Sequence, residues 1–323
     1  METTVLGRTG RLVSVAGLGC GGSSRVGLGR GLTPSQCGEI VRLAIDEGVS
    51  LIDTAGAYGT EEIVGLALKG IPPGAVTLST KSHYRDKDGL FPAALVIDNL
   101  HASLRRLGRE RVEIFHVHAV RPGDYAHVMD ELVPALEAEK AAGSIGHLGL
   151  TETPPNDPRQ VMMTRAVHDP VWEVVMVAFH LMHQLPRRLV FPTTLAMETG
   201  TLIMFAVRHI FSRPERLSRA IAELSAQGAI PPEFARETEP LAPLVEAAGA
   251  KSLTELAYRF ARHEPGADVV LFGTGDKEHL RQNVAAINGP PLPDETLSTL
   301  SQLFGHLTGV GLDRPDHMRA GAG

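Results

Sequence analysis

Short apolar segments alternate with amphipathic helical stretches along most of the chain, and this alternation constrains the fold more than any other feature of the sequence. The apolar segments are rich in β-branched residues, and each is followed by a stretch in which apolar residues recur with helical spacing. We predict strands at residues 13–18, 49–53, 76–80, 112–117, 145–150, 174–179, 201–207 and 269–272. Strict alternation of strand and helix predicts a parallel sheet. Eight such units close naturally into a (β/α)8 TIM barrel, so the predicted fold class is α/β.

The segments between the predicted strands carry signals for helix starts and ends. Thr33 followed by Pro34 is typical of an N-cap and a first helical position, and Gly48 is typical of a helix end. We predict helices at residues 35–47, 61–69, 92–107, 127–142, 158–168, 187–199, 213–226, 253–263 and 277–287. The stretch 229–243 carries four prolines and no clean period, so we expect a loop over the C-terminal face of the barrel there. The polar segment 316–323 is expected to fray.

Composition narrows the class of protein. With 323 residues, 43% of them hydrophobic, the chain can bury the core of a single barrel domain that spans residues 1–323. A net charge of −6 without a basic cluster argues against a nucleic-acid partner. The lack of a long apolar run argues against a membrane span, and the first residues do not read as a secretory signal. Cys20 and Cys37 are the only cysteines, which favours a reduced, cytoplasmic setting and excludes a zinc site built from cysteines.

Four polar residues stand at or just after the ends of consecutive predicted strands. Asp53 ends the second strand, Tyr58 follows it in the loop, Lys81 ends the third strand and His118 ends the fourth. In a barrel of parallel strands, residues at these ends are the ones that read as catalytic. Any one of them has an ordinary structural explanation, such as a helix cap or a solvated lysine. Four in succession predict an active site.

These four residue types form a coherent acid–base group. A tyrosine normally ionises near pH 10, and a neighbouring ammonium favours the phenolate and lowers that pKa. Lys81 can supply the ammonium, and Asp53 can keep a buried Lys81 charged. His118 can orient a substrate oxygen by hydrogen bonding while Tyr58 donates a proton to it. The pattern therefore predicts proton transfer to a carbonyl oxygen as hydride arrives at the carbon.

Three spans that carry these residues resemble the signature regions of the aldo-keto reductase family: LIDTAGAYGTEEIVGLAL, TLSTK and VEIFHVHAV. The opening TTVLGRTGRLVSVAGLGCGG resembles the N-terminal hairpin that plugs the bottom of the barrel in that family. The resemblance implies a catalytic tetrad of Asp53, Tyr58, Lys81 and His118. It also implies interconversion of an aldehyde or ketone and its alcohol, by a carbonyl reductase or an alcohol or aldose dehydrogenase. The partner is then a small-molecule carbonyl or alcohol.

The segment LFGTGDKEHLRQNVAAI resembles the part of the family that binds the phosphates of a nicotinamide cofactor, and a Gly-rich loop that opens a helix can hold an anion. The likeness implies contacts from Gly273, Thr274, Lys277, Arg281 and Asn283. Asp276 stands where many NADPH-preferring members carry a basic residue, and Lys277 and Arg281 partly compensate for it. We therefore expect NADPH, with NADH as the alternative.

The residues expected to hold the nicotinamide depart from the family pattern. Thr151 and Glu152 stand where the family usually has Ser-Asn, and Met176 stands where a glutamine is usual. Phe205 is the nearest candidate for the aromatic residue that stacks on the nicotinamide. Together with Asp53 of the tetrad, these residues are the expected contacts to the nicotinamide end of the cofactor.

Two other readings of the motifs remain open. His116 and His118 form an H-x-H pair whose side chains share one face of a strand, which would suit a metal-dependent barrel hydrolase. The altered nicotinamide contacts would suit a non-catalytic barrel that binds the nucleotide as a regulatory subunit.

The glycines of residues 17–22 fit G-x-G-x-x-G by letter. No helical period follows them, so we interpret the segment as a flexible loop that brings the backbone of Gly22 near the cofactor rather than as a Rossmann fingerprint.

Overall fold

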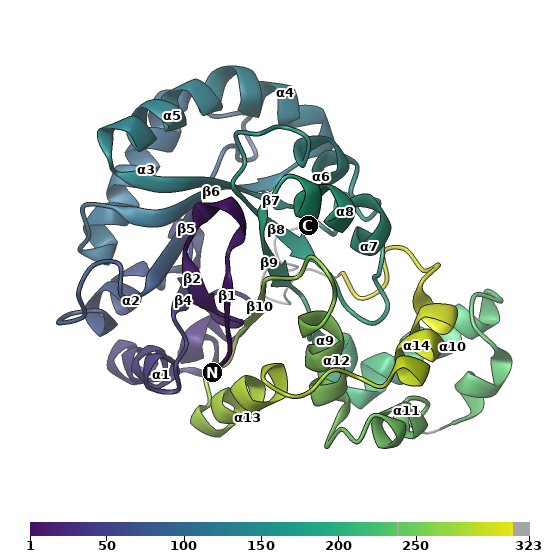
Figure 1. Ribbon diagram of the computed structural model, residues 1–323. Coiled ribbons are helices and arrows are strands. Elements are labelled where there is room, and N and C mark those ends of the chain that lie inside the picture. The colour runs from purple at the N-terminus through teal and green to yellow at the C-terminus, as the bar shows by residue number, and fades with distance from the viewer. Residues whose placement is uncertain (238, 313–323) are drawn as a thin grey trace.

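A computed structural model, which describes residues 1–237 and 239–312, has a closed barrel of eight parallel strands at its centre (Figure 1). The barrel strands are β3 (Ala16–Gly19), β4 (Leu51–Asp53), β5 (Thr77–His83), β6 (Val112–Val120), β7 (Ile145–Glu152), β8 (Val174–Ala178), β9 (Gly200–Met204) and β10 (Val269–Phe272). They follow one another around the barrel in chain order, and β10 closes it by pairing with both β9 and β3. The predicted (β/α)8 fold is confirmed.

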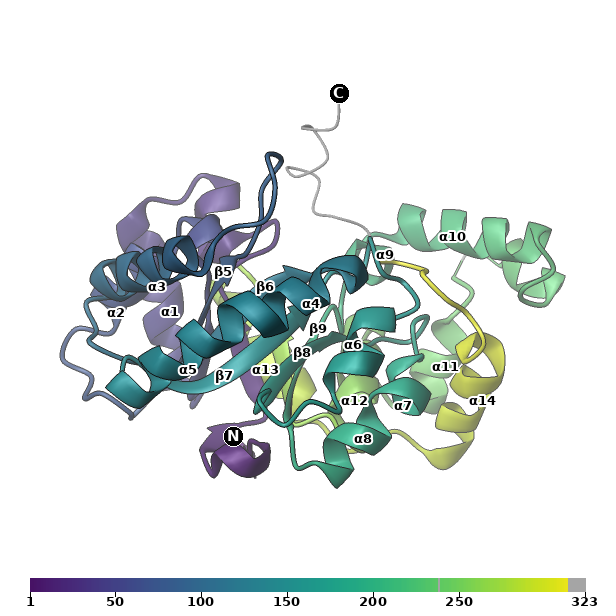
Figure 2. The ribbon, with the colours of Figure 1, turned by 90° about the horizontal axis from the view of Figure 1, so that it is seen from above.

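Helices surround the barrel and connect its strands (Figure 2). They are α1 (Pro34–Asp46), α2 (Glu61–Ala67), α3 (Ala93–Leu107), α4 (Tyr125–His127), α5 (Val133–Ala142), α6 (Val161–Ala166), α7 (Pro186–Leu189), α8 (Phe191–Ala196), α9 (His209–Ser212), α10 (Pro214–Ala226), α11 (Ala242–Ala247), α12 (Leu253–Arg262), α13 (Lys277–Ile287) and α14 (Asp294–Phe304). Helix α1 begins as its sequence predicts: the Thr33 hydroxyl accepts a hydrogen bond from the Gln36 N–H, and the Gln36 side chain accepts one from the Thr33 N–H.

The N-terminal hairpin closes the bottom of the barrel. Strands β1 (Thr3–Val5) and β2 (Leu12–Ser14) pair antiparallel, with Thr4 opposite Val13. Leu6 and Val13 are fully buried and pack against apolar side chains inside the barrel, among them Ile114 and Leu202. The short turn between β1 and β2 thus lies under the barrel as the sequence predicts.

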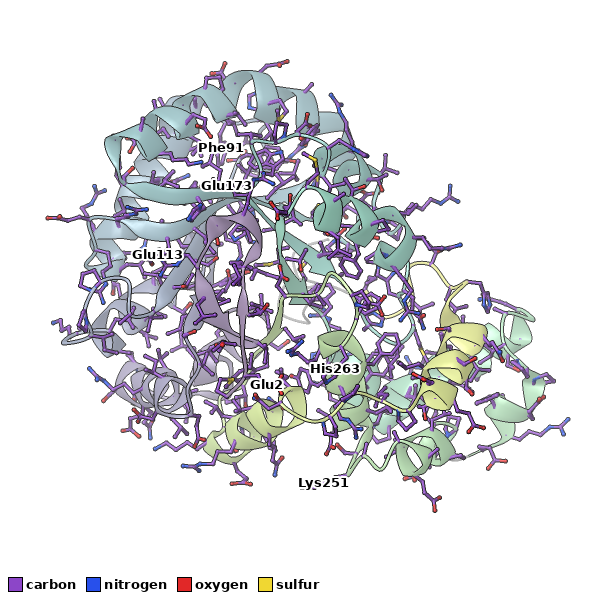
Figure 3. The ribbon with its side chains drawn as sticks, viewed as in Figure 1. Glu2, Phe91, Glu113, Glu173, Lys251 and His263 are labelled. Carbon is purple, nitrogen blue, oxygen red and sulfur yellow. The ribbon has the colours of Figure 1, made fainter. Side chains whose placement is uncertain are left out.

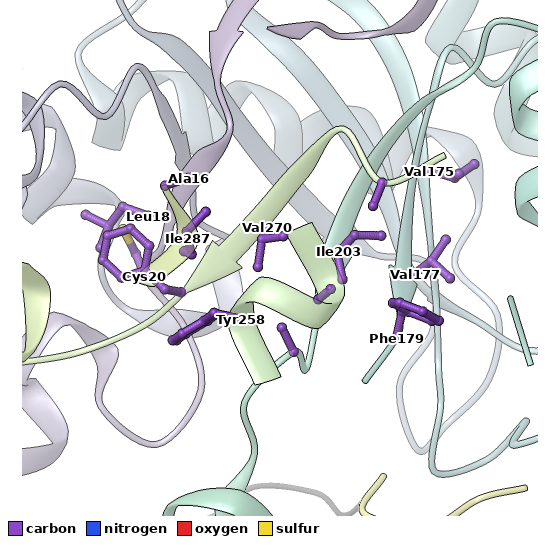
Figure 4. Packing of buried hydrophobic residues seen from close by; sticks show 14 of the residues in the cluster. Ala16, Leu18, Cys20, Val175, Val177, Phe179, Ile203, Tyr258, Val270 and Ile287 are labelled. Carbon is purple, nitrogen blue, oxygen red and sulfur yellow. The ribbon is translucent and has the colours of Figure 1, made fainter. Parts of the chain in front are cut away.

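The larger core fills the space between the outer face of the barrel and the helices. Val270 on β10 and Ile203 on β9 point outward from neighbouring strands, and Tyr258 on α12 packs in the same cluster (Figure 4). A half-buried carboxylate near the start of β6 adds a polar contact to the neighbouring strand β5. Glu113 accepts a hydrogen bond from the Leu78 N–H at 2.9 Å (Figure 3). The strands are therefore held by packing on both faces, and β5 and β6 also by this hydrogen bond.

Several predicted boundaries are wrong, each for a local reason. The predicted strand 13–18 is two strands, because Val15 lies between the hairpin and the barrel and its N–H donates to the Glu2 carbonyl. The predicted helix 187–199 divides at Val190 into α7 and α8. The predicted helix 127–142 contains a π-helical turn at Val128–Leu132. The predicted strand 201–207 ends at Met204, because Phe205 has a positive φ of 69°.

The later part of the chain holds more helix than the sequence suggested. The stretch 229–243 carries a short helical turn, Pro232–Arg236, which packs with α10 beside the barrel (Figure 2). Helices α11 and α14 were not predicted, and the segment 316–323 lies outside the described residues. Within the part of the chain that the structure describes, no helix has the length and apolar character needed to cross a membrane.

Candidate active site

Asp53, Tyr58, Lys81 and His118 come together at the C-terminal end of the barrel. Asp53 is the last residue of β4, and Tyr58 ends the short 3-10 turn Gly56–Tyr58 that follows it. Lys81 and His118 lie on the neighbouring strands β5 and β6, where Lys81 is in register with His116. Alternate residues of a strand share a face, so Asp53, Lys81 and His118 all point into the barrel.

The centre of the group is a buried ion pair. The Lys81 ammonium donates to both Asp53 carboxylate oxygens, at 2.8 and 2.6 Å, and to the Thr54 carbonyl at 3.0 Å. The Ser79 hydroxyl donates to the same carboxylate at 2.8 Å. Burial lowers the pKa of Lys81, but Asp53 and Tyr58 together raise it above its usual value. Lys81 is therefore a fixed positive charge at neutral pH.

Tyr58 lies beside this charge. The Lys81 Nζ atom is 5.1 Å from the centre of the Tyr58 ring. Burial raises the pKa of Tyr58, Lys81 acts in the opposite direction, and the net pKa stays above its usual value. The direction is opposite to the lowered pKa that the sequence predicts, because desolvation outweighs the ammonium. The phenol is thus protonated at neutral pH and equipped to act as an acid.

His118 completes the group from the other side of the tyrosine. Its ring meets the Tyr58 ring edge-on, with centroids 5.8 Å apart. Burial first, and then the nearby charges of His83, Lys81 and His116, hold its pKa well below the usual value. A neutral imidazole can donate one hydrogen bond to a substrate oxygen without competing with Tyr58 for a proton. His83, which the sequence analysis missed, stacks on His118 at 4.4 Å. Its spacing of two residues from Lys81 on one strand was the available signal.

Two glycines that the sequence analysis did not single out lie directly against the rings of Tyr58 and His116. A Cβ atom at Gly21 would lie 2.5 Å from the Tyr58 ring. One at Gly149 would lie 2.2 Å from the His116 ring. The loop after β3 therefore holds Tyr58 by direct backbone contact, which no local pattern reveals.

A cavity of about 1300 Å³ is lined by Asp53 and Tyr58, by the ends of β3, β9 and β10, by the first turn of α12 and by α13 with the loop that follows it. It exceeds the roughly 300–1,000 Å³ of common small-molecule sites. Its walls combine the backbone of Gly22 and Gly273, the side chains of Met176 and Phe205, and polar residues of α13. A cavity of this size, with both apolar side chains and polar helix residues in its wall, can hold a dinucleotide.

The structure brings some of the predicted cofactor residues to this cavity. Gly22, Asp53, Met176, Phe205, Gly273, Thr274 and Asn283 line it. Phe205 holds a positive φ of 69°, a strained value for an aromatic residue that is typical of functional sites, and the Arg208 guanidinium lies 4.0 Å from its ring centre. Phe205 is therefore well placed to present its ring to a bound group.

Thr151 and Glu152 do not line the cavity, since neighbouring groups engage both side chains. The Thr151 hydroxyl accepts a hydrogen bond from the Ala119 N–H at 2.7 Å, where β6 bulges. The Glu152 carboxylate accepts one from the Ala178 N–H at 2.6 Å and two from the Gln160 amide at 3.2 Å. Burial raises the pKa of Glu152 to about 8. Both residues hold the ends of adjacent strands.

Lys277 and Arg281 also point away from the cavity. Lys277 pairs with Glu39 on α1 at 2.7 Å, and Arg281 pairs with Glu47 just beyond the end of α1 at 2.9 Å. On α13, the neighbouring residues Glu278, His279 and Gln282 line the cavity instead. Neither the Lys277 nor the Arg281 side chain therefore lies where it would touch a group in the cavity.

Neither the G-x-G-x-x-G pattern of residues 17–22 nor the H-x-H pair of His116 and His118 forms the site that its sequence pattern suggests. Residues 17–19 lie in strand β3, and no helix begins on the glycines that follow. Both ring nitrogens of His116 are buried without a hydrogen-bond partner, and its ring packs against Gly149. Among the described residues, no three His, Cys, Asp or Glu side chains are grouped so that they could hold a metal ion.

A parallel barrel with buried polar side chains and a large cavity at its C-terminal end has the architecture of a barrel enzyme. The aldo/keto reductase family model matches residues 17–304, so the chain belongs to that family and is a nicotinamide-dependent oxidoreductase. This assignment confirms the family resemblance.

Relatives of nearly full length support the assignment. The chain is 28% identical to L-galactose dehydrogenase of Arabidopsis thaliana, over 94% of each protein. It is 24% identical to the uncharacterised oxidoreductase YqkF of Bacillus subtilis, over 93% of this chain and 95% of the relative.

Solved structures share the fold. Aldo-keto reductase AKR11C1 of Bacillus halodurans in its holo form superposes with a TM-score of 0.70 at 20% identity, over 94% of this chain and 96% of that one. An aldo/keto reductase of Klebsiella pneumoniae in complex with NADP and acetate superposes with a TM-score of 0.67 at 21% identity, with the same coverage.

Proposed function

We propose that the protein interconverts an aldehyde or ketone and its alcohol, with Tyr58 as the general acid and base. The observation that carries the proposal is the convergence of Tyr58, Lys81 and His118 at the C-terminal end of the barrel, with the Lys81 Nζ atom 5.1 Å and the His118 ring centre 5.8 Å from the centre of the Tyr58 ring. A bound reduced nicotinamide would supply the hydride to the carbonyl carbon. The residues of the chain supply the proton and hold the oxygen.

Each residue has a distinct part in reduction. His118 donates a hydrogen bond to the carbonyl oxygen and orients it beside Tyr58. As the carbon accepts hydride, the Tyr58 hydroxyl gives its proton to that oxygen, and the alcohol forms. The Lys81 ammonium, fixed by Asp53, stabilises the phenolate that remains until a proton returns. Oxidation of an alcohol uses the same atoms in the reverse order.

Substitution of the tyrosine tests this assignment. Tyr58→Phe should lower kcat for carbonyl reduction by about 10²- to 10⁴-fold, because general-acid catalysis is removed while the ring is kept. Binding of the dinucleotide, followed by quenching of protein fluorescence, should persist. Tyr84→Phe is a matched control, because Tyr84 donates to Asp124 outside the tetrad. Full turnover by Tyr58→Phe would overturn the proposal.

The substrate panel should include small aldehydes, ketones and hydroxylated sugars, since the panel then spans a carbonyl reductase and an alcohol or aldose dehydrogenase. A relative named L-galactose dehydrogenase supports the sugars. Dinucleotide binding without turnover of any compound would favour the alternative of a non-catalytic regulatory barrel. One observation supports that alternative: the side chains of Thr151 and Glu152, expected to hold the nicotinamide, accept hydrogen bonds from the backbone of neighbouring strands instead.

The choice between NADPH and NADH is a separate part of the proposal. The sequence predicts NADPH on the strength of Lys277 and Arg281, and a neighbour solved with NADP is compatible with that prediction. The carboxylates of α12 and α13 that line the cavity favour the other cofactor.

A further inference from the structure

Away from Tyr58, the cavity is lined by the first turn of α12 and by one side of α13, from Glu278 to Ala286. Two carboxylates stand there, Glu255 on α12 and Glu278 on α13, with Lys251 just before α12. Glu278 accepts a hydrogen bond from the Gln282 amide through Oε1, at 3.2 Å. If the nicotinamide end of a dinucleotide lies at Tyr58, its adenosine end reaches this wall.

The phase of α13 determines which charges face the cavity. Residues four apart on a helix share a face, so Glu278 and Gln282 lie on the cavity side and Lys277 and Arg281 lie on the side of α1. The two basic residues are paired there with Glu39 and Glu47. Exposed pairs of this kind are weak. Lys277 and Arg281 are therefore kept out of the cavity because they lie on the opposite side of α13, and not because their ion pairs are strong.

The N-terminus of α12 already carries its own negative charge. The Ser252 hydroxyl accepts a hydrogen bond from the Glu255 N–H at 3.2 Å, and the Glu255 carboxylate accepts one from the Lys251 N–H at 3.3 Å. The positive end of this helix is thus matched by Glu255 and does not favour a second anion. The exposed Lys251 and the His279 imidazole stand beside the two carboxylates of this wall, and Arg259 pairs with one of them, Glu255, at 3.5 Å.

We infer that this wall selects the dinucleotide without a 2′-phosphate, NAD(H), and that Glu278 accepts a hydrogen bond from the adenosine ribose. A ribose diol presents hydroxyl donors to a carboxylate, and an acidic residue performs this role in NAD sites of other folds. A 2′-phosphate would bring about two negative charges toward Glu255 and Glu278. The inference rests on the proposed function and adds the cofactor to it.

Direct binding separates the inference from the proposed function. ADP-ribose and 2′-phospho-ADP-ribose, which cannot transfer hydride, are titrated into the protein by calorimetry, and NADH and NADPH are titrated by fluorescence quenching. The non-phosphorylated member of each pair should bind at least ten times more tightly. Equal or tighter binding of the phosphorylated members would overturn the inference and leave the proposed function intact. Failure of all four compounds to bind would overturn both.

A charge-removing substitution tests the role of Glu278. Glu278→Gln should weaken NADH binding severalfold and leave NADPH binding unchanged or tighter, so the preference narrows. The matched control is Glu47→Gln, which frees Arg281 on the other face of α13 and should leave the preference unchanged. If Glu278→Gln keeps the full preference, or if Glu47→Gln abolishes it, the wall described here does not set the choice.

Discussion

Glu152 allows a test of how burial controls the charge of this site. Its side chain is 2% exposed at the end of β7, and burial raises its pKa from 4.5 to about 8 although three hydrogen bonds favour the anion. At pH 7 the folded protein therefore keeps a proton on Glu152 that the unfolded chain has released. Folding then becomes less favourable as the pH rises from about 4.5 to about 8, and the effect is complete above that range.

The size of the effect follows from the shift. One proton taken up on folding changes the free energy of unfolding by roughly 1 kcal/mol per pH unit within this window. Glu152→Gln removes the titration and keeps an acceptor for the Ala178 N–H. The new amide group can also donate to the Gln160 Oε1 atom, which is buried without a partner. The variant should therefore gain stability relative to the parent protein by a few kcal/mol between pH 5 and pH 8.

Urea unfolding at half-unit steps from pH 5 to pH 9 measures the difference directly. The stability difference between Glu152→Gln and the parent should grow across the window and become constant above about pH 8. Glu223→Gln, on the exposed face of α10, is measured in parallel as the control for the loss of a carboxylate. A constant difference for Glu152→Gln would refute the reasoning, because Glu152 would then be ionised in the folded protein.

Three further predictions concern the tetrad. Gly21→Ala places a Cβ 2.5 Å from the Tyr58 ring and should lower kcat by about tenfold or more with little change in melting temperature, as steady-state kinetics and calorimetry would show. Lys81→Met leaves the buried Asp53 carboxylate unpaired and should destabilise the protein by about 3–5 kcal/mol, whereas Asp53→Asn combined with Lys81→Met should recover most of that loss in urea unfolding. Because the pKa of Tyr58 is raised, reduction should stay constant through neutral and mildly alkaline pH, while oxidation, which needs the phenolate, should rise with pH up to that pKa in initial-rate profiles.

The sequence predicts the barrel well because each of its units is defined locally. Helix α1 shows this, since its cap at Thr33 and its end before Gly48 depend on residues within one turn. Boundaries fail where the chain bends without a change of polarity. Residues 13–18 form one apolar run, yet the run divides where the hairpin meets the barrel. Helix α14 escaped prediction although it buries Leu300 and Phe304 against the rest of the protein.

The four acid–base residues were predictable because each stands at the end of its own strand. Their surroundings were not, because contacts such as Gly21 with Tyr58, or Gly149 with His116, join segments that are far apart in the sequence. The same limit applies to pKa values. Lys81 beside Tyr58 suggests a lowered pKa, and only the extent of burial shows that desolvation prevails.

The rotation of α13 about its axis determines which of its charged side chains face the cavity. In the segment DKEHLRQN, acidic and basic residues are neighbours, so a rotation of α13 by one residue would exchange the charges that face the cavity. Composition and motif are unchanged by such a rotation, which is why Lys277 and Arg281 read as phosphate contacts in the sequence. The phase is fixed by packing, since Leu280, Val284 and Ile287 are buried in the core. With those apolar residues inward, the basic pair is directed to Glu39 and Glu47 beside α1, and Glu278 faces the cavity.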